Sequence, residues 1–169
     1  GESWETLMQQ RLFEPLEMDS CGFGVQDPDG TLEHPWGHDG TTPIHGDNPA
    51  AAGPAGTVYC NLFDWGDFII EQLRGYRGEG TLFSYQQYQS IFEIQGDNYA
   101  LGWAVVDRPW AGGNVFTHSG SNTLNAAVIW GAPELNEAYL AVSNSATSET
   151  WQVLDQLVGM LVGLDDPEK

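Results

Sequence analysis

Four stretches of the chain carry apolar residues at the spacing of an amphipathic helix, namely residues 3–14, 61–75, 84–93 and 148–162. The first three open with Ser3, Asn61 and Ser84, whose side chains can accept a hydrogen bond from the first helical turn. Gln87 completes a capping box with Ser84. The residues expected on the buried face of the first helix are Trp4, Leu7, Met8 and Leu12. The pattern predicts three helices in the first part of the chain and one at its end.

The later part of the chain changes to the alternation of polar and apolar residues that is typical of β-strands. We expect strands at residues 99–106, 115–118, 124–130 and 138–143, separated by turns rich in Gly, Pro and Asn. Residues 19–56 are instead predicted to be one long irregular stretch that wraps a site. This order predicts an α+β fold, in which an antiparallel sheet of three to four strands lies between N-terminal helices and a C-terminal covering helix. We expect residues 1–169 to form a single domain.

The charge of the chain is strongly one-sided, with 24 Asp and Glu residues against 5 Lys and Arg residues and a net charge of −19. A polyphosphate surface would repel such a chain, which excludes nucleic acid as a partner. The sequence holds no apolar run of the length of a transmembrane helix, which excludes membrane insertion. Its N-terminus has no basic and apolar regions of a signal peptide. Hydrophobic residues make up 41% of the chain, so it can bury a core and is expected to fold.

The cysteines and the histidines of the chain are the candidates for a redox or metal site. Cys21 and Cys60 have no CxxC spacing, and we expect buried free thiols, with one disulfide as the alternative. A group of three histidines and two aspartates could in principle supply zinc ligands; its members are His34, His38, Asp39, His45 and Asp47. Histidines four residues apart face one ion on a helix, and the Pro and Gly residues between them forbid a helix. We therefore expect no metal and no cofactor.

The most informative motif is the triplet His118-Ser119-Gly120 at the end of a predicted strand. It follows two other blocks, Phe-Glu-Pro-Leu-Glu-Met at residues 13–18 and Pro-Ala-Gly at residues 54–56, and the run Tyr-Ala-Leu-Gly-Trp at 99–103. In this order the blocks resemble the serine β-lactamase-like family of class C β-lactamases, DD-peptidases and esterases. The triplet takes the place of the family's Lys-Thr-Gly, in a His-x-Gly variant. The resemblance covers nearly the whole chain.

The resemblance implies a substrate-binding strand beside a nucleophile. Its residues would be His118, Ser119, Gly120 and Ser121, with the Ser121 N–H as one oxyanion-hole donor. Gly120 would let an extended substrate pass close to the backbone. His118 would face a substrate carboxylate or the proton network, although a histidine is mostly neutral at pH 7 where the family's lysine is charged. The implied reaction is acyl transfer from an ester, an amide or a β-lactam.

The family's nucleophile motif Ser-x-x-Lys is absent, because the only lysine is Lys169 and residue 166 is Asp. The tripeptide Tyr59-Cys60-Asn61 has the residue pattern of the family's Tyr-x-Asn motif. It lies after the Pro-Ala-Gly block, however, whereas the family's motif precedes the Phe-x-Pro-Leu-x-Met block. We therefore interpret Asn61 as a helix cap and Tyr59 as a packing residue. The resemblance then implies that the chain is the C-terminal part of such a domain, without the N-terminal strands and the nucleophile-bearing helix. On its own the chain is expected to be inactive.

Two alternatives remain open. A triad could form from His118 with Ser119, Ser121, Ser143 or Ser145, but neighbouring strand residues point to opposite faces, which disfavours the first pair. The chain could instead be a non-catalytic folded module or a pseudoenzyme piece that binds a partner or its missing half. The family topology also implies that residues 138–143 form an exposed sheet edge, for which we expect a homo-oligomer. By resemblance, the protein would be periplasmic or secreted.

Overall fold

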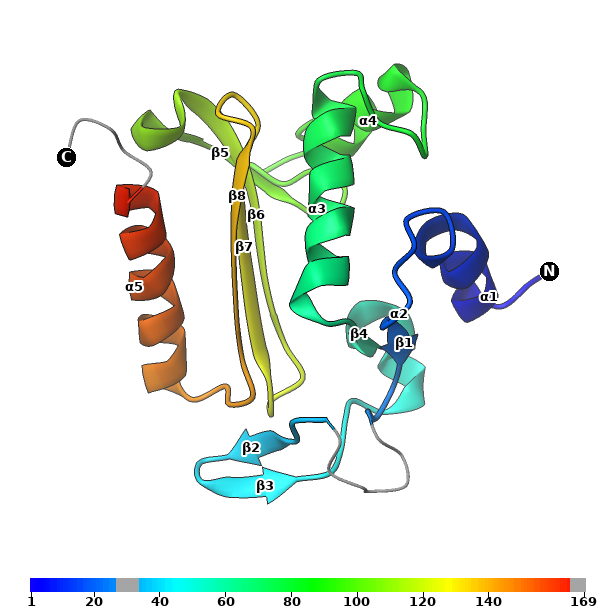
Figure 1. Ribbon diagram of the computed structural model, residues 1–169, viewed down its shortest axis with the longest axis vertical. Helices are drawn as coiled ribbons and strands as arrows, with labels where there is room; N and C mark the ends of the chain where they lie inside the picture. Colours follow the sequence, from blue (N-terminus) through cyan, green and yellow to red (C-terminus); the bar gives the residue numbers. More distant parts are fainter. Residues whose placement is uncertain (27–33, 165–169) are drawn as a thin grey trace.

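The computed structural model describes residues 1–26 and 34–164, and its centre is one antiparallel sheet with helices on both sides (Figure 1). Helix α5 (Ser148–Leu164) covers one face of the sheet, and α3 (Leu62–Tyr76) lies against the other. Helix α4 (Tyr85–Phe92) packs on α3. The predicted α+β architecture is confirmed. None of the described helices is long and apolar enough to cross a membrane.

The sheet contains four strands in the order β5-β6-β7-β8, each antiparallel to its neighbour. Their bounds are Ala104–Arg108, Gly113–Ser121, Ala126–Ala132 and Glu137–Ser143. The first strand begins five residues later than predicted, because Asp97, Asn98 and Gly102 adopt positive φ angles. The chain there folds into a tight hairpin in which Tyr99 pairs with Ala104.

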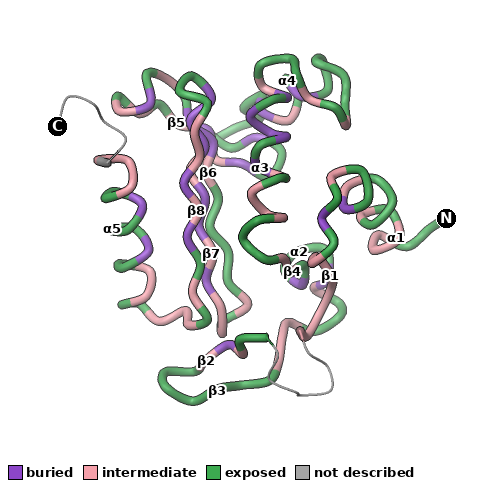
Figure 2. Tube along the Cα trace, in the orientation of Figure 1, coloured by how far each residue is buried: buried purple, intermediate pink, exposed green. Residues whose placement is uncertain are grey.

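The register divides the sheet side chains into two apolar layers. Phe116 and Ile129 lie on the α3 face, with Ile69 and Leu73 of the helix packed against them. Val128 and Ala141 lie on the α5 face, together with buried side chains of that helix. In Figure 2, buried positions lie along the strands of the sheet and along α3 and α5, the helices on its two faces. Strand β7 accordingly contains no exposed residue, as expected for a strand that is covered on both faces.

Local hydrogen bonds explain where the main helices begin. Asn61 caps α3 by accepting a bond of 2.8 Å from the Asp64 N–H. Ser84 and Gln87 form the predicted capping box of α4. The predicted helix positions are confirmed. For α3 the apolar spacing predicts a buried stripe of Leu62, Trp65, Ile69 and Leu73. The structure differs in detail, because Leu62 is 47% exposed while the polar side chain of Glu71 is buried.

Glu71 organises the connection between α3 and α4. Its carboxylate accepts hydrogen bonds from the Thr81 N–H and hydroxyl, from the Leu82 N–H and from the Tyr88 hydroxyl. Burial raises the pKa of Glu71, but these hydrogen bonds outweigh burial and hold the pKa below its ordinary value. The ring of Tyr88 is fully buried against Gly75 and Gly80, where a β-carbon would collide with it.

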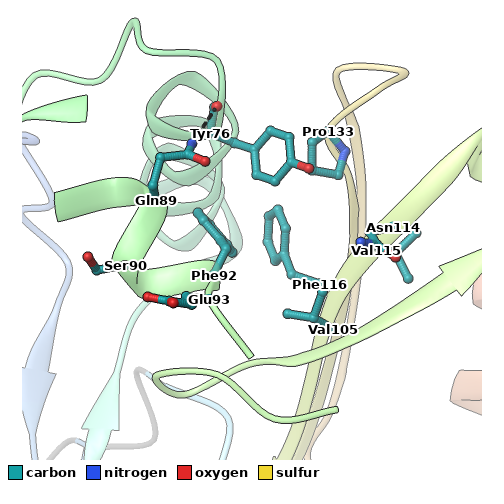
Figure 3. A pocket seen from close by; sticks show the side chains of 10 residues that line it. All are labelled: Tyr76, Gln89, Ser90, Phe92, Glu93, Val105, Asn114, Val115, Phe116 and Pro133. Carbon is teal, nitrogen blue, oxygen red and sulfur yellow. Dashed lines mark hydrogen bonds between the residues drawn. The ribbon is translucent and has the colours of Figure 1, made fainter. Parts of the chain in front are cut away.

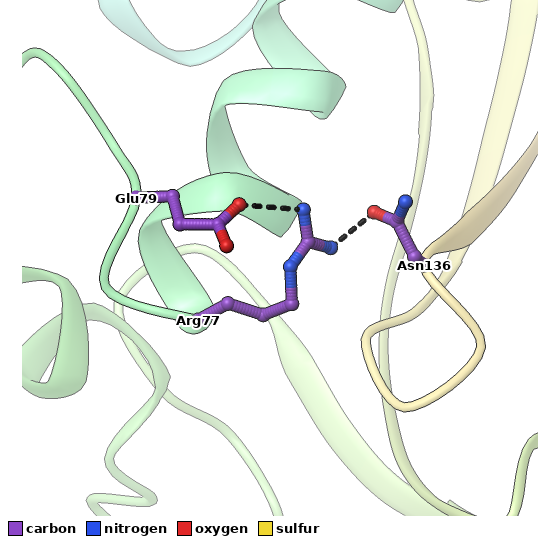
Figure 4. Close-up of polar contacts among 3 residues, drawn as sticks. All are labelled: Arg77, Glu79 and Asn136. Carbon is purple, nitrogen blue, oxygen red and sulfur yellow. Dashed lines mark hydrogen bonds and ion pairs between the residues drawn. The ribbon is translucent and has the colours of Figure 1, made fainter.

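A second polar contact joins α3 to the far end of the sheet. The guanidinium of Arg77, just beyond α3, donates to the side-chain oxygen of Asn136 in the turn between β7 and β8 (Figure 4). It also forms an ion pair of 3.2 Å with Glu79. Asn136 adopts a positive φ of 58°, as a tight turn often requires. The contact therefore holds the helix end against the sheet.

The N-terminal helix starts at Ser3, whose hydroxyl accepts from the Thr6 N–H as predicted. Helix α1 (Trp4–Met8) continues as a π-helical segment, Gln9–Phe13. The wider π-turns shift the buried position by one residue. Phe13 is therefore the buried side chain in place of Leu12. Leu7, in the α-helical part, is 41% exposed, so the predicted buried face was wrong at both positions.

The stretch 19–56 contains more regular structure than predicted. Strand β1 (Gly22–Phe23) pairs with β4 (Val58–Tyr59), and β2 (Gly37–Asp39) forms a hairpin with β3 (Thr42–Ile44). The three-residue helix Ala50–Ala52 and helix α2 (Gly53–Gly56) follow. Residues 27–33 of this stretch lie outside the described part of the chain. The pairing of β1 with β4 depends on contact between segments far apart in the chain, which local periodicity does not encode.

Cys21 and Cys60 form a disulfide, so the expectation of free thiols was wrong. The pairing of β1 with β4 brings the two cysteines together across 39 residues of sequence. Beside the disulfide, the Ser20 N–H and hydroxyl donate to Asp64 in the first turn of α3. These contacts attach the N-terminal segment to the start of α3.

Candidate functional site

The candidate site is the second half of strand β6, where its outer edge is free. Strand β5 pairs with β6 only as far as Thr117, whereas β7 continues to pair with it as far as Ser121. In the described part of the chain, no strand pairs with the other side of His118–Ser121. All four residues of this segment are exposed (Figure 2). An unpaired edge of this kind can accept an extended ligand as an additional strand.

His118 stands at the start of this free edge and has a partner that sequence reasoning missed. Its Nε2 lies 3.1 Å from the hydroxyl of Tyr99, and the two rings meet edge to face. When Tyr99 donates, the imidazole is neutral and carries its proton on Nδ1. In the sequence, Tyr99 is the first residue of the Tyr-Ala-Leu-Gly-Trp block, whose place in the order of motifs is the signal that could have assigned it to the site.

Gly120 is not required by the packing of the protein itself. A β-carbon built at this position would meet no atom within 4 Å, and the backbone angle there is an ordinary one. Gly131, by contrast, lies under the Phe116 ring and has no room for a side chain. The missing side chain at Gly120 therefore leaves open space on the face of the strand that it shares with His118, where a ligand can approach.

The end of the strand is held by a small network of polar groups. The Ser121 hydroxyl accepts from the Thr123 N–H at 2.8 Å. Asn122 accepts from two backbone N–H groups of the following turn and donates to Asp47 at 2.9 Å. These bonds hold Thr123 at a positive φ of 74°, which is unusual for a β-branched residue. The network fixes where the free edge ends.

The structure does not assemble the alternative triad. Ser119 points to the opposite face of the sheet from His118, because adjacent strand residues alternate. Ser143 pairs with Ala126 on the other side of β7, and Ser145 is bridged to His38. Among the described residues, no serine hydroxyl is a hydrogen-bond partner of His118.

The predicted histidine group is spread over separate contacts. His38 Nδ1 lies 3.2 Å from the Asn144 carbonyl oxygen, and His45 stacks on Trp36 with its Nε2 3.2 Å from the Gln26 carbonyl oxygen. Asp47 bonds to Asn122, and His34 is exposed. Among the described residues, no three acidic, histidine or cysteine side chains are grouped to hold a metal ion. These histidines instead help to dock the β2–β3 hairpin.

Tyr59 and Asn61 have the structural roles that we expected. Asn61 caps α3, and the Tyr59 ring lies across Gly22 of the paired strand. The predicted cap at Asn61 and the packing role of Tyr59 are therefore confirmed.

Two cavities adjoin the sheet. One, of about 350 Å³, lies between α4 and the beginning of β6, where Tyr76, Phe92 and Phe116 face one another (Figure 3). It is near the opposite end of β6 from Gly120. The other, of about 420 Å³, lies on the α5 side and is lined by His118 and Ser119 among others. The second cavity therefore belongs to the candidate site.

Comparisons with known proteins identify the family and the fold of the chain. A family model described as Beta-lactamase matches residues 1–159. The fold is similar to the octameric penicillin-binding protein homologue from Pyrococcus abyssi, with a TM-score of 0.68 at 17% identity over 94% of this chain and 38% of that chain. It is also similar to the beta-lactamase/D-alanine carboxypeptidase from Pseudomonas syringae, with a TM-score of 0.70 at 18% identity over 94% of this chain and 53% of that chain.

A third similar structure is that of SurE, with a TM-score of 0.71 at 18% identity over 98% of this chain and 42% of that chain. No curated protein matches the sequence. The chain therefore spans between 38% and 53% of the length of these three structures.

Proposed function

This chain belongs to the beta-lactamase family, and we propose that it is the part of a serine hydrolase that presents the substrate-binding strand. The observation that carries the proposal is the free edge of β6 at His118–Ser121, which β5 leaves uncovered beyond Thr117. The substrate is a small or peptide-like ester, amide or β-lactam. The reaction proceeds through an acyl-enzyme.

The backbone of the edge supplies most of the proposed chemistry. An extended substrate pairs with the N–H and C=O groups of the strand, and the open space at Gly120 allows it to lie close. The Ser121 N–H is one of the donors to the oxyanion that develops in the transition state. A fixed donor of this kind contributes on the order of 3 kcal/mol to the lowering of the barrier.

His118 and Tyr99 form the polar boundary of this strand. The Tyr99 hydroxyl fixes the orientation of the imidazole through Nε2 and leaves Nδ1 free to bond to the substrate. A neutral imidazole holds a carboxylate less strongly than a permanent cation does. We therefore infer that the substrates need not carry the carboxylate of penicillin-type compounds.

The nucleophile is proposed to lie in a part of the protein outside these 169 residues. The sequence contains no Ser-x-x-Lys, and the chain spans no more than 53% of the similar structures. The chain alone is then inactive toward nitrocefin and short p-nitrophenyl esters, with rates equal to those of a His118→Ala control. Turnover above that control would contradict the proposal and support a triad within the chain.

Binding tests the proposal more directly than turnover. We would titrate the chain with N-acetyl tripeptide amides and follow the backbone amide resonances of β6 by NMR. Resonances of Ser119, Gly120 and Ser121 are expected to shift, while those of the first half of β6, covered by β5, stay in place. If the resonances of the free edge do not move with any peptide, the alternative of a non-catalytic module that binds another partner is favoured.

The opposite edge of the sheet, β8, is proposed to join copies of the chain. In the described residues, β8 pairs only with β7. Leu157 is 41% and Met160 66% exposed, and both lie on the flank of α5 turned away from β6. The similar protein from Pyrococcus abyssi is octameric. A net charge of −19 opposes association mainly at low salt, so we expect oligomers to be favoured by rising ionic strength.

Light scattering in low and high salt measures this association. Val142→Pro removes a backbone donor from β8, and Leu157→Asp adds a charge to the apolar flank without changing the strand. Both are expected to weaken association. A monomer under both salt conditions in the unchanged protein would contradict the proposed interface.

The disulfide supports a periplasmic or secreted location. Disulfides persist in oxidising compartments and are rare in the reducing cytosol. Cys21–Cys60 joins two segments next to the start of α3, which gives it a structural position. We propose that the protein matures in such a compartment.

A further inference from the structure

The geometry points to a specificity pocket for the substrate. We propose that the cavity between α5 and the outer part of the sheet accepts a bulky, uncharged apolar side chain of the extended substrate. This inference rests on the proposed function, in which the substrate pairs with His118–Ser121.

The cavity is formed because α5 does not cover the whole sheet. The helix packs on β8 and β7, which leaves open the same face of β6 and of the start of β5. The resulting volume of about 420 Å³ lies within the roughly 300–1,000 Å³ of small-molecule sites. Trp130 and Val128 form its floor, Trp151 and Leu154 of α5 form one wall, and Tyr99 and Ala104 form its end.

The strand register places this cavity within reach of the bound substrate. Ser119 pairs with Val128 and Thr117 pairs with Trp130, so the side chains of all four lie on the α5 face. A substrate strand paired with the free edge turns every second side chain toward that same face. A side chain of the substrate next to Ser119 therefore enters the cavity, and the side chains before and after it lie on the His118 face.

The chemistry of the lining selects the kind of side chain. Two indole rings and the aliphatic side chains of Val128 and Leu154 favour apolar groups. Among the described residues that line the cavity, Asp155 is the only Asp, Glu, Lys or Arg, and it is exposed. It repels a carboxylate, as does the net charge of −19. The expected order of preference is therefore Leu or Phe above Ala, with Asp last.

The experiment is a titration of the 169-residue protein with the peptides N-acetyl-Gly-Xaa-Gly-amide, in which Xaa is Leu, Ala or Asp. Binding is followed through the amide resonances of Ser119–Ser121. The Leu peptide is expected to bind at least about fivefold more tightly than the Ala peptide, because it buries more apolar surface. The Asp peptide is expected to bind most weakly.

Two variants on α5 separate charge at the cavity from charge elsewhere. Asp155→Asn is expected to improve binding of the Asp peptide and leave the Leu peptide unchanged. Glu149→Gln makes the same change of charge on the same helix outside the cavity and is expected to change neither. An equal gain in affinity for the Asp peptide in both variants would overturn the assignment of Asp155 to the pocket.

The apolar preference is tested with Trp151→Ala and with Ala104→Leu, which fills the cavity and removes no core contact. Both are expected to abolish the preference for Leu over Ala. A Leu preference that survives Ala104→Leu in a folded protein would overturn the inference. Equal binding of Leu and Ala peptides by the unchanged protein would also overturn it, while shifts at Ser119–Ser121 would leave the proposed function standing. If no peptide shifts these resonances, the proposed function itself fails.

Discussion

The hydroxyl of Tyr99 and the Nε2 of His118 lie 3.1 Å apart although 19 residues separate them in the sequence. Tyr99 stands in the tight hairpin that precedes β5, and its pairing with Ala104 places the ring beside the point where β6 loses its outer neighbour. The contact therefore joins the hairpin before β5 to the start of the free edge of β6.

Replacement of Tyr99 by Phe is expected to weaken binding of an extended peptide to the edge by about two- to tenfold, the value of one hydrogen bond. The free energy of unfolding should change by less than about 1 kcal/mol, because Tyr99 is 44% exposed. Peptide titration by NMR measures the first quantity and denaturant unfolding the second. Tyr85→Phe, at an exposed tyrosine outside the site, is the control and should leave the affinity unchanged.

Gly120 and Gly131 form a matched pair of alanine substitutions. Gly120→Ala should leave the free energy of unfolding within about 0.5 kcal/mol, because a β-carbon there meets no atom, and should lower peptide affinity. Gly131→Ala places a β-carbon 2.2 Å from the Phe116 ring and should destabilise the fold by about 1–3 kcal/mol or more. Undiminished peptide binding in Gly120→Ala would show that no ligand approaches this side of the strand.

Glu71 should make the stability of the protein depend on pH in the acid range. Its folded-state pKa lies below the ordinary value of 4.5, so its contribution is fully present above 4.5 and is lost as the pH falls through the folded-state pKa. Glu71→Gln should lower stability near neutral pH by about 1–3 kcal/mol, since buried donors lose a charged acceptor. It should also flatten the loss of stability on acidification.

Thermal unfolding between pH 3 and pH 7 measures this effect. Glu14→Gln, at an exposed position, is the control and should follow the unchanged protein. If the melting temperature of Glu71→Gln falls with decreasing pH as steeply as that of the unchanged protein, the acid sensitivity belongs to other groups.

Loss of the Cys21–Cys60 disulfide should lower the free energy of unfolding by about 3–4 kcal/mol, the loop-closure entropy of a separation of 39 residues. Urea unfolding of the Cys21→Ser, Cys60→Ser double variant measures the loss. Intact mass before and after reduction gives an independent check, since oxidation of the pair removes two hydrogens. Two thiols that react with a maleimide in the unreduced, unfolded protein would contradict the pairing.

Most of the elements could be predicted because local forces set them. The cap at Asn61 and the capping box at Ser84 involve residues three apart, and both appear where the sequence placed them. Strands β6 to β8 form where β-branched and apolar residues are bounded by turn residues, although β7 contains no exposed position. The disulfide Cys21–Cys60 was not expected because it joins residues 39 positions apart. Phe13 takes the buried position expected for Leu12 because the helix widens to a π-helix at Gln9–Phe13.

The amino-acid sequence by itself determined the order of helices and strands, the surplus of negative charge and the position of the His-Ser-Gly triplet in a strand, because periodicity, caps and composition are local properties. Only the tertiary structure decided that the pairing of β5 with β6 ends at Thr117, that Tyr99 reaches His118, and that α5 leaves a cavity beside Ser119. Each of these depends on where one element ends against another. The physical reason is that strand register and helix placement are set by packing between segments far apart in the chain, which no local pattern contains.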